Sequence, residues 1–545
     1  MTQPGPTGRL RWTSRPLGPL GRRDASRGLR RRHPVLGLVA TVVGALSLSS
    51  CAVLPFVSQD PPATSAAPAP GSQDPPASST GLTSFYSQRL SWSSCSGGEC
   101  ASLTVPVDYG NPGAGSLKLA LLRVPAGRPS ERLGSLVVNP GGPGGSGVDY
   151  AKAATRIVGA VVHDRFDVVG FDPRGVGRSA PLDCLGDAGL DTFLATDPTP
   201  DTGAEEQALL AQGKALGAGC LAKNPQLLAH VSTIDVAKDL DVLRAALGEA
   251  KLNYLGKSYG TFIGSTYAGL FPLKVGRMVL DGVVPPELSA QEVNLGQAEG
   301  FERATRAYVQ DCIQQAGCPL GTTVDGGMRW LADFLVRVDA QPVPVTDDQR
   351  VTQLDEGWAS IALAEAMYDQ SYWSPLSDGL KAAVGGDGNL LMRIADAYAD
   401  RTPGGQYTGN LLEVLYAVNC VDRPETGDLA SFRSAAAAAE KVAPIFGRNI
   451  AWSSVVCSQW PVKGTDPPHT ISAKGSGPIV VVGTTRDPAT PYEWSVKLRQ
   501  ELANAVLISY DGDGHTAYKR SNACVDDPID AYFVDGTTPQ DGLRC

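Results

Sequence analysis

Short apolar runs alternate with helix-like segments in two separate parts of the chain. The earlier runs are residues 101–106, 116–124, 133–138, 167–171, 252–255 and 276–280, and the later ones are 478–483 and 505–510. Residues 234–248 have apolar positions at helical spacing. Short buried strands that alternate with helices predict an α/β fold with a mostly parallel central sheet, covered by helices on both faces.

Between these two parts, residues 286–472 are helical and loop-rich, with many Ala, Gln and Asp and no evident alternation of strands and helices. The pattern predicts one sheet interrupted by a large, mainly helical cap over the strand ends. We therefore expect the first part of the core in residues 85–285, the cap in 286–472 and the C-terminal part of the core in 473–545.

The N-terminal 50 residues have the pattern of an export signal. Three arginines at 30–32 precede an apolar stretch, 35–48, which ends in small residues before Cys51. The stretch is shorter than the about 20 residues that span a bilayer, and its order predicts a secretory signal peptide. Its ending resembles a bacterial lipobox, which implies lipidation of Cys51 and anchoring to the outside of the cell membrane. An ordinary cleaved signal is the alternative. Residues 51–84, rich in Pro, Ala and Ser, predict a flexible linker.

The formal charge is unevenly distributed along the chain. Residues 1–50 hold nine arginines, no lysine and one acid, so they carry +8 and leave −17 for the remainder of a chain of net charge −9. A body this acidic repels phosphate backbones, so nucleic acid is not expected as a partner. With 42% hydrophobic and 19% charged residues, the chain can bury a large core.

Ten of the eleven cysteines remain when Cys51 is set aside. An even number in an exported protein indicates disulfides, although sequence alone does not fix their connectivity. Pairing nearest neighbours would give bridges 95–100, 184–220, 312–318, 420–457 and 524–545. Zinc is the alternative, but the chain has no Cys-x-x-Cys pair and its five histidines are scattered. No metal and no organic cofactor is implied.

The sequence Gly-Lys-Ser-Tyr-Gly at 256–260 is the central motif. An apolar strand at 252–255 precedes it, and an apolar helix starting at Thr261 follows it. A nucleophile elbow has this context, because its sharp strand-to-helix turn needs small flanking residues and exposes the serine hydroxyl. Ser258 is therefore the candidate nucleophile. The alternative is a helix-capping serine in a glycine-rich turn.

A serine nucleophile needs a base and an acid that orients the base. In the order serine, acid, histidine, only His515 follows a late strand, and Asp487 follows the strand before it. Asp511 and Asp513 are rival acids, but they lie too close to His515 in sequence to reach its far nitrogen easily. The predicted triad is Ser258, Asp487 and His515.

Two further glycine-rich turns follow strands. Residues 139–147 are placed to supply a main-chain donor to an oxyanion hole, together with the amide of Tyr259. A phosphate loop is the alternative, but the Gly-Lys-Ser/Thr ending is missing. The turn at 172–179 is expected to be structural, with Asp172 paired to Arg174.

Six motifs together resemble the exported tripeptidyl aminopeptidases and related serine proteases of actinobacteria. These belong to the prolyl-aminopeptidase-like α/β-hydrolases and have a TAP-like C-terminal region. The motifs are NPGGPGGSG at 139–147, FDPRGVGRS at 171–179, GKSYGT at 256–261, VNCVD at 418–422, TTRDPATP at 484–491 and GDGHTAY at 512–518. The resemblance covers residues from about 85 to 545 and implies the α/β-hydrolase fold with a large helical cap.

The resemblance also implies roles for particular residues. Relatives usually read HGGPG in the oxyanion loop, and Pro140 stands here where that histidine would be. The second oxyanion donor then falls on Gly142, beside Tyr259. Thr490 matches a residue that lies behind the triad in this family.

Relatives of this type hold the substrate ammonium with carboxylates of the cap. Asp422 and Glu425 are the candidates in this chain. The alternative is that both are solvated or merely brace the disulfide at Cys420.

These expectations combine into an exported, lipid-anchored serine peptidase that releases short, tripeptide-like N-terminal peptides through an acyl-enzyme. A cell-envelope carboxylesterase or lipase, or a serine endoprotease, would use the same triad on an ester or internal peptide bond. A non-catalytic ligand-binding lipoprotein is the remaining alternative. The expected partners are a peptide or ester substrate and the membrane, the latter through the N-terminal lipid only; the sequence does not indicate an oligomeric state.

Overall fold

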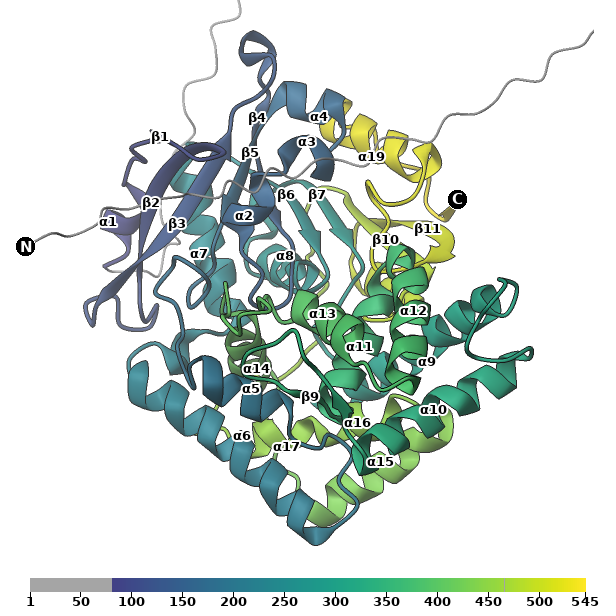
Figure 1. The fold of residues 1–545 in the computed structure, drawn as a ribbon. Coiled ribbons are helices and arrows are strands. Elements are labelled where there is room, and N and C mark those ends of the chain that lie inside the picture. Colours follow the sequence, from purple (N-terminus) through teal and green to yellow (C-terminus); the bar gives the residue numbers. More distant parts are fainter. Residues whose placement is uncertain (1–80, 465) are drawn as a thin grey trace, which may run out of the picture. The chain divides into compact units, whose positions relative to one another are not determined.

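The computed structural model describes residues 81–464 and 466–545 and is built on one ten-stranded sheet (Figure 1). The strand order is β1-β2-β3-β5-β4-β6-β7-β10-β11-β12. The pairs from β1 to β5 are antiparallel, and those from β5 to β12 are parallel. The bounds are β1 Ser93–Cys95, β2 Gly98–Pro106, β3 Ser116–Val124, β4 Gly134–Asn139, β5 Phe166–Phe171, β6 Leu252–Lys257, β7 Val275–Asp281, β10 Ile479–Arg486, β11 Ala505–Asp513 and β12 Leu543–Arg544. Every apolar run predicted as a strand forms one, and the α/β-hydrolase fold is confirmed.

Alternate residues of each central strand pack on opposite faces of the sheet. In β10, Val480 and Val482 join one core cluster, and Ile479 and Val481 join the other. The first face is covered by α2 Gly147–Ala151, α3 Ala154–Ile157, α4 Ala160–Arg165 and α19 Ala523–Asp535; the second by α7 Thr233–Ala246, α8 Tyr259–Leu270 and α18 Tyr492–Glu501. Because both faces are buried, these strands have continuous apolar sequences. A short helix, α1 Thr83–Tyr86, precedes the sheet.

The insertion between β7 and β10 is the helical cap that the sequence predicts. It contains a small two-stranded sheet, β8 Val343–Pro344 with β9 Gln353–Leu354. Its helices are α9 Ala290–Cys312, α10 Val324–Ala340, α11 Glu356–Tyr368, α12 Trp373–Val384, α13 Asn389–Tyr398, α14 Leu411–Asp422, α15 Leu429–Val442, α16 Gly447–Trp452 and α17 Ser454–Ser458.

Two helices from the first part of the chain also belong to the cap. They are α5 Asp187–Leu194 and α6 Gly203–Lys223, which lie among the cap helices in Figure 1. The buried Arg401 binds Asp191 of α5 at 2.8 Å, and Arg433 of α15 binds Glu206 of α6 at 2.5 Å. The predicted boundaries had assigned these helices to the core. Both helices precede β6 in the chain, which suggested the core. The apolar residues of α6 do not form one stripe, so the sequence did not show which surface the helix packs against.

All five nearest-neighbour disulfides are present in the structure. They are Cys95–Cys100, Cys184–Cys220, Cys312–Cys318, Cys420–Cys457 and Cys524–Cys545. Cys420–Cys457 joins α14 to α17 within the cap. Five bridges are consistent with folding in an oxidising compartment.

The turn at 172–179 is structural, but the expected pairing of Asp172 with Arg174 is wrong. Arg174 is buried and binds Asp239 of α7 at 2.7 Å. Asp172 instead accepts hydrogen bonds from Ser146 Oγ at 2.5 Å and from the Arg178 amide at 3.0 Å. The two charges therefore tie the turn to different neighbours, one of them the loop that leads from β4 into α2.

The predicted signal, the lipidation site Cys51 and residues 51–80 of the predicted linker lie outside the described residues. Within the part that is described, no helix combines the length and the apolar character needed to cross a membrane.

Candidate active site

Ser258 lies in a strained turn between β6 and α8. Its φ of 54° and ψ of −128° put a residue other than glycine in a region that L-residues rarely occupy. A Cβ added at Gly256 would lie 2.4 Å from the main-chain oxygen of Gly260, and one added at Gly260 would lie 2.8 Å from that of Asn139. The two flanking glycines are therefore required by close backbone contacts. The geometry is that of the predicted nucleophile elbow.

His515 and Asp487 form the predicted base and acid pair. His515 Nδ1 lies 2.9 Å and 3.0 Å from the two carboxylate oxygens of Asp487. The carboxylate is fully buried and also accepts from the amides of Ala489, Thr490 and Thr516. A carboxylate can only accept, so Nδ1 carries the hydrogen and Nε2 keeps a lone pair. Among the described residues, the buried Nε2 has no hydrogen-bond partner.

The rival acids hold the turn of Asp487 in place. Asp513 Oδ1 accepts from Arg486 Nε at 2.5 Å, and Asp511 Oδ1 accepts from Arg486 Nη1 at 2.7 Å. Both carboxylates are thus engaged by the residue just before Asp487. The order-based choice of Asp487 agrees with this geometry.

The cap contacts His515 directly. The His515 amide donates to the main-chain oxygen of Tyr368 at 3.0 Å, and the Tyr368 ring meets the imidazole edge-on with centroids 5.3 Å apart. Tyr368 is the last residue of α11. The orientation of the base therefore depends on the cap as well as on the sheet.

Lys257 and Asp281 connect the elbow to the histidine loop. The main-chain oxygen of Asp281 accepts from the Ser258 amide at 3.0 Å, and its buried carboxylate accepts from the amides of Ala517 and Tyr518 at 2.9 Å and 3.0 Å. Lys257 Nζ donates to the oxygen of Tyr518 at 2.6 Å and lies 3.4 Å from the Asp281 carboxylate. Burial lowers the pKa of Lys257, which the nearby carboxylate opposes.

Sequence reasoning missed both residues. Lys257 occupies the variable position of the elbow motif, and Asp281 ends a strand, so neither position alone signals a role. The next residue, Gly282, is so close to the histidine that an added Cβ would lie 3.4 Å from His515 Cε1. The end of β7 is thus close to both loops, because Asp281 binds the Ser258 amide and Gly282 lies beside the His515 ring.

The predicted oxyanion loop packs against the elbow. A Cβ added at Gly141 would lie 2.8 Å from Ser258 Cβ and 2.9 Å from the Tyr259 nitrogen. The Gly141 amide donates to Asn139 Oδ1 at 2.9 Å, so it is already occupied within the loop. Gly142, Ser258 and Tyr259 line the same cavity. Gly142 and Tyr259 thus lie beside Ser258, and their amides remain the predicted oxyanion donors.

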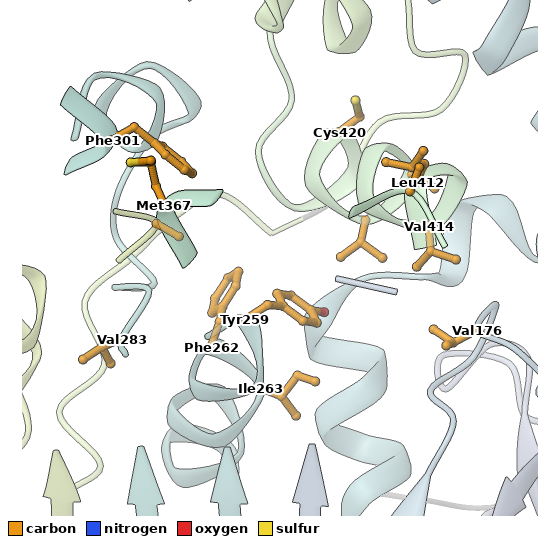
Figure 2. Packing of buried hydrophobic residues seen from close by; sticks show 14 of the residues in the cluster. Val176, Tyr259, Phe262, Ile263, Val283, Phe301, Met367, Leu412, Val414 and Cys420 are labelled. Atoms are coloured by element: carbon orange, nitrogen blue, oxygen red, sulfur yellow. The ribbon is translucent and has the colours of Figure 1, made fainter. Parts of the chain in front are cut away.

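The cavity at Ser258 has a volume of about 310 Å³ and lies between the core and the cap. Aromatic side chains form much of its wall, among them Phe301, Tyr368 and Tyr416. Figure 2 shows the rings of Tyr259 and Phe262 at the start of α8, below cap side chains that include Phe301. A mostly apolar cavity with a few polar groups is typical of a ligand site.

Thr490 lies where the family resemblance implies. Its hydroxyl is 3.3 Å from His515 Nδ1, and its amide donates to Asp487 at 2.8 Å. It also lines the cavity. The residue therefore contacts both members of the base and acid pair.

The candidate ammonium ligands are not part of the cavity wall. Asp422 accepts from the amide and hydroxyl of Thr233, at 2.9 Å and 2.5 Å, and the Thr233 hydroxyl is 2.6 Å from that of Tyr259. Burial raises the pKa of Asp422 to about 6. Glu425 accepts from the adjacent Thr426 amide at 3.1 Å. These contacts give neither carboxylate a place in the wall of the cavity, and their role as ammonium ligands stays a prediction.

One group of carboxylates elsewhere has a spacing that could hold a metal ion. Oxygens of Asp197, Asp339 and Glu356 lie within 4.8 Å of one another. Burial raises the pKa of Glu356 to about 8, and the Thr199 hydroxyl donates to its carboxylate at 2.8 Å. None of the three residues lines the cavity at Ser258.

Replacing Lys257 with Met should lower kcat about 10- to 100-fold with little change in KM, because a small displacement of the base costs that much. The exposed Lys251, just before β6, provides a matched control, and K251M should stay near wild type. Steady-state kinetics on a short acyl ester, with a melting curve for each variant, would measure this. Equal kcat values for the two variants would show that the Lys257 contacts do not position His515.

Comparisons with known proteins identify the family of this chain. An α/β hydrolase fold family model matches residues 134–325, and a TAP-like protein model matches 443–545. Serine protease Hip1 of Mycobacterium tuberculosis is 40% identical over 462 residues, covering 82% of this chain and 87% of that protein. Carboxylesterase B of the same species is 37% identical over 457 residues (82% and 86%), and tripeptidyl aminopeptidase of Streptomyces lividans is 34% identical over 456 residues (82% and 83%). The chain therefore belongs to the family of α/β-hydrolase-fold serine peptidases that includes these tripeptidyl aminopeptidases and serine protease Hip1.

Proposed function

We propose that this serine peptidase is exported, anchored by a lipid on Cys51, and releases short peptides from the free N-terminus of its substrates. One observation carries the catalytic part: a strained Ser258 precedes α8, and the half-buried His515 has its Nδ1 bound to Asp487 and its Nε2 without a partner in the described structure. The names of the Streptomyces relatives support cleavage near the N-terminus, as tripeptidyl aminopeptidases.

The geometry accounts for both halves of an acyl-enzyme reaction. Ser258 Oγ attacks the peptide carbonyl while His515 Nε2 takes the hydroxyl proton, and Asp487 stabilises the imidazolium through Nδ1–H. The Gly142 and Tyr259 amides bind the oxyanion. His515 then gives its proton to the leaving amine. Water attacks the acyl-Ser258 next, losing its proton to Nε2, which returns it to Ser258 Oγ as the acid product leaves.

The proposed location rests on the N-terminal pattern and on the disulfides. The basic region, the short apolar stretch and Cys51 have the order of a lipoprotein signal. Five disulfides are consistent with an oxidising compartment outside the cytoplasm.

Cleavage inside a polypeptide, or hydrolysis of an ester, is the second candidate. No carboxylate side chain of a described residue lines the cavity, so nothing on its wall would pair with a substrate ammonium. The relatives named serine protease Hip1 and carboxylesterase B also support this candidate. The triad chemistry is the same in either case.

Anchoring can be tested with full-length protein made in a bacterium that processes lipoproteins. Wild type should incorporate labelled palmitate and enter the detergent phase, whereas Cys51→Ser should lose the label and remain in the aqueous phase. Ala52→Ser is the neighbouring control and should behave as wild type. Labelling that persists in the C51S variant would contradict the anchor.

The triad assignment predicts a sharp difference between two aspartates of the same region. Ser258→Ala and Asp487→Asn should each lower kcat by about four orders of magnitude, because the nucleophile or the orientation of the base is lost. Asp511→Asn changes only contacts to Thr485 and Arg486 and should retain activity within about tenfold. Turnover of a p-nitrophenyl ester, compared at matched melting temperatures, would measure this. An active D487N enzyme would contradict the mechanism.

Peptides with a free or an acetylated N-terminus would distinguish the two candidate functions. If the enzyme is an aminopeptidase, acetylation should reduce kcat/KM at least about tenfold, because a charged hydrogen bond contributes about 1.5–3 kcal/mol. Mass spectrometry of the products should then show short N-terminal fragments only. Internal cleavage at equal rates for both peptides would select the endopeptidase, and turnover of esters alone would select the esterase.

A further inference from the structure

The described wall of the cavity at Ser258 includes a positively charged side chain and no negatively charged one. Among the described residues that line it, Arg423 is the only charged side chain. The other polar lining groups are neutral, such as the amides of Asn294, Gln297 and Asn419 and the hydroxyl of Tyr398. A cavity with this wall favours a negatively charged ligand group over a positively charged one.

Arg423 is buried without an anionic partner. Only 5% of the residue is exposed, and neither of the carboxylates that act on its charge in the described structure, Asp422 and Glu287, forms an ion pair with it; Glu287 pairs with Lys497 instead. Its Nε donates to the main-chain oxygen of Leu288 at 2.9 Å, and its Nη2 donates to that of Pro285 at 3.3 Å. The neighbouring Asp422 is occupied by Thr233. Burial lowers the pKa of Arg423, and the charges of Asp422 and Glu287 oppose this shift.

One edge of the guanidinium remains available to a ligand. In the described part of the chain, Nη1 donates no hydrogen bond, and it is not one of the fully buried atoms that lack a partner. Arg423 is one of the residues that line the cavity at Ser258, and Nη1 is its nitrogen without a bond to the described chain. The two main-chain oxygens and the Phe262 ring, 4.5 Å from the guanidinium carbon, hold the group in one orientation.

Two aromatic side chains connect the guanidinium to the turn of Ser258. Phe262 lies in the first turn of α8, and its ring meets that of Tyr259 edge-on at 6.1 Å. Figure 2 shows these two rings together at the start of the helix that follows Ser258. A ligand group on Arg423 and a carbonyl at Ser258 would therefore share one small cavity.

We propose that Arg423 binds a carboxylate of the substrate and so determines which acyl compounds Ser258 processes. The planar guanidinium matches a carboxylate, and a desolvated cation without a partner gains most from binding an anion. The carboxylate is either the C-terminus of a short peptide or an acidic side chain. This inference rests on the proposed function, since it assumes that the substrate of Ser258 occupies this cavity.

Protection of Ser258 from a fluorophosphonate label tests the proposal without requiring turnover. The first pair of ligands is Ala-Ala-Ala with a free C-terminus and its C-terminal amide. The second set is amidated tripeptides with Glu or Gln at each position in turn. In wild type, the charged member of at least one pair should protect Ser258 at a concentration about 10- to 100-fold lower than the neutral member.

The variants separate recognition from folding. Arg423→Gln should abolish the preference for the charged ligand. Arg423→Lys, which keeps the charge but not the planar pair of donors, should reduce it severalfold and serves if R423Q fails to fold. Arg393→Gln is the charge-matched control, because Arg393 is exposed and binds Asp347 elsewhere on the cap, and it should keep the wild-type preference. Melting temperature and the labelling rate without ligand report the state of each variant.

The outcomes distinguish a failure of the role proposed for Arg423 from a failure of the proposed serine peptidase function. Absence of Ser258 labelling in folded wild type would contradict the proposed function itself. Normal labelling with equal protection by charged and neutral ligands, or no protection by either, would overturn the role of Arg423 and leave the hydrolase intact. A preference that persists unchanged in R423Q, or in R423K where R423Q is unfolded, would overturn it as well.

Discussion

One buried carboxylate, that of Asp281, joins the two loops on which catalysis depends. Its main chain holds the Ser258 amide, and its side chain holds two amides just after His515. Lys257, next to Ser258, binds the main-chain oxygen of Tyr518 and the carboxylate of Asp281 with its ammonium group. A buried ion pair seldom adds net stability, because desolvation offsets the attraction. Its effect here is geometric. The loops that carry Ser258 and His515 come from distant parts of the chain, and both are hydrogen-bonded to Asp281 through their main-chain amides.

The cap covers the carboxyl edge of the sheet and forms much of the wall of the cavity at Ser258. It also supplies the charged lining residue, Arg423. Tyr368 at the end of α11 supports the imidazole. At the end of α14, adjacent residues of opposite charge have different surroundings, since Asp422 binds Thr233 and Arg423 lines the cavity. In a space of low dielectric constant, a single unpaired charge dominates the recognition of a ligand. The chain is acidic outside its basic head, yet the lining of the described cavity carries a cation.

The sequence predicted the strands and the Asp487–His515 pair because each depends on local signals. The apolar runs mark strands buried on both faces, and Gly256 and Gly260 mark a turn in which a Cβ would clash. Contacts between distant segments had no such signal. The assignment of α5 and α6 to the cap is of this kind, as is the binding of Arg174 to Asp239 rather than to Asp172. Charge and proximity in sequence suggested partners, but the packing of whole elements decides which charges meet.

A carboxylate on Arg423 and release of short N-terminal peptides are physically compatible. A tripeptide in extended form spans about 10 Å, and a cavity of about 310 Å³ lies at the small end of ligand sites. A short peptide therefore brings its own C-terminal carboxylate into the same space as the bond at Ser258. In a long polypeptide the C-terminus is remote, and only an acidic side chain near the scissile bond could reach Arg423. The source of the carboxylate thus depends on substrate length, which the volume under the cap limits.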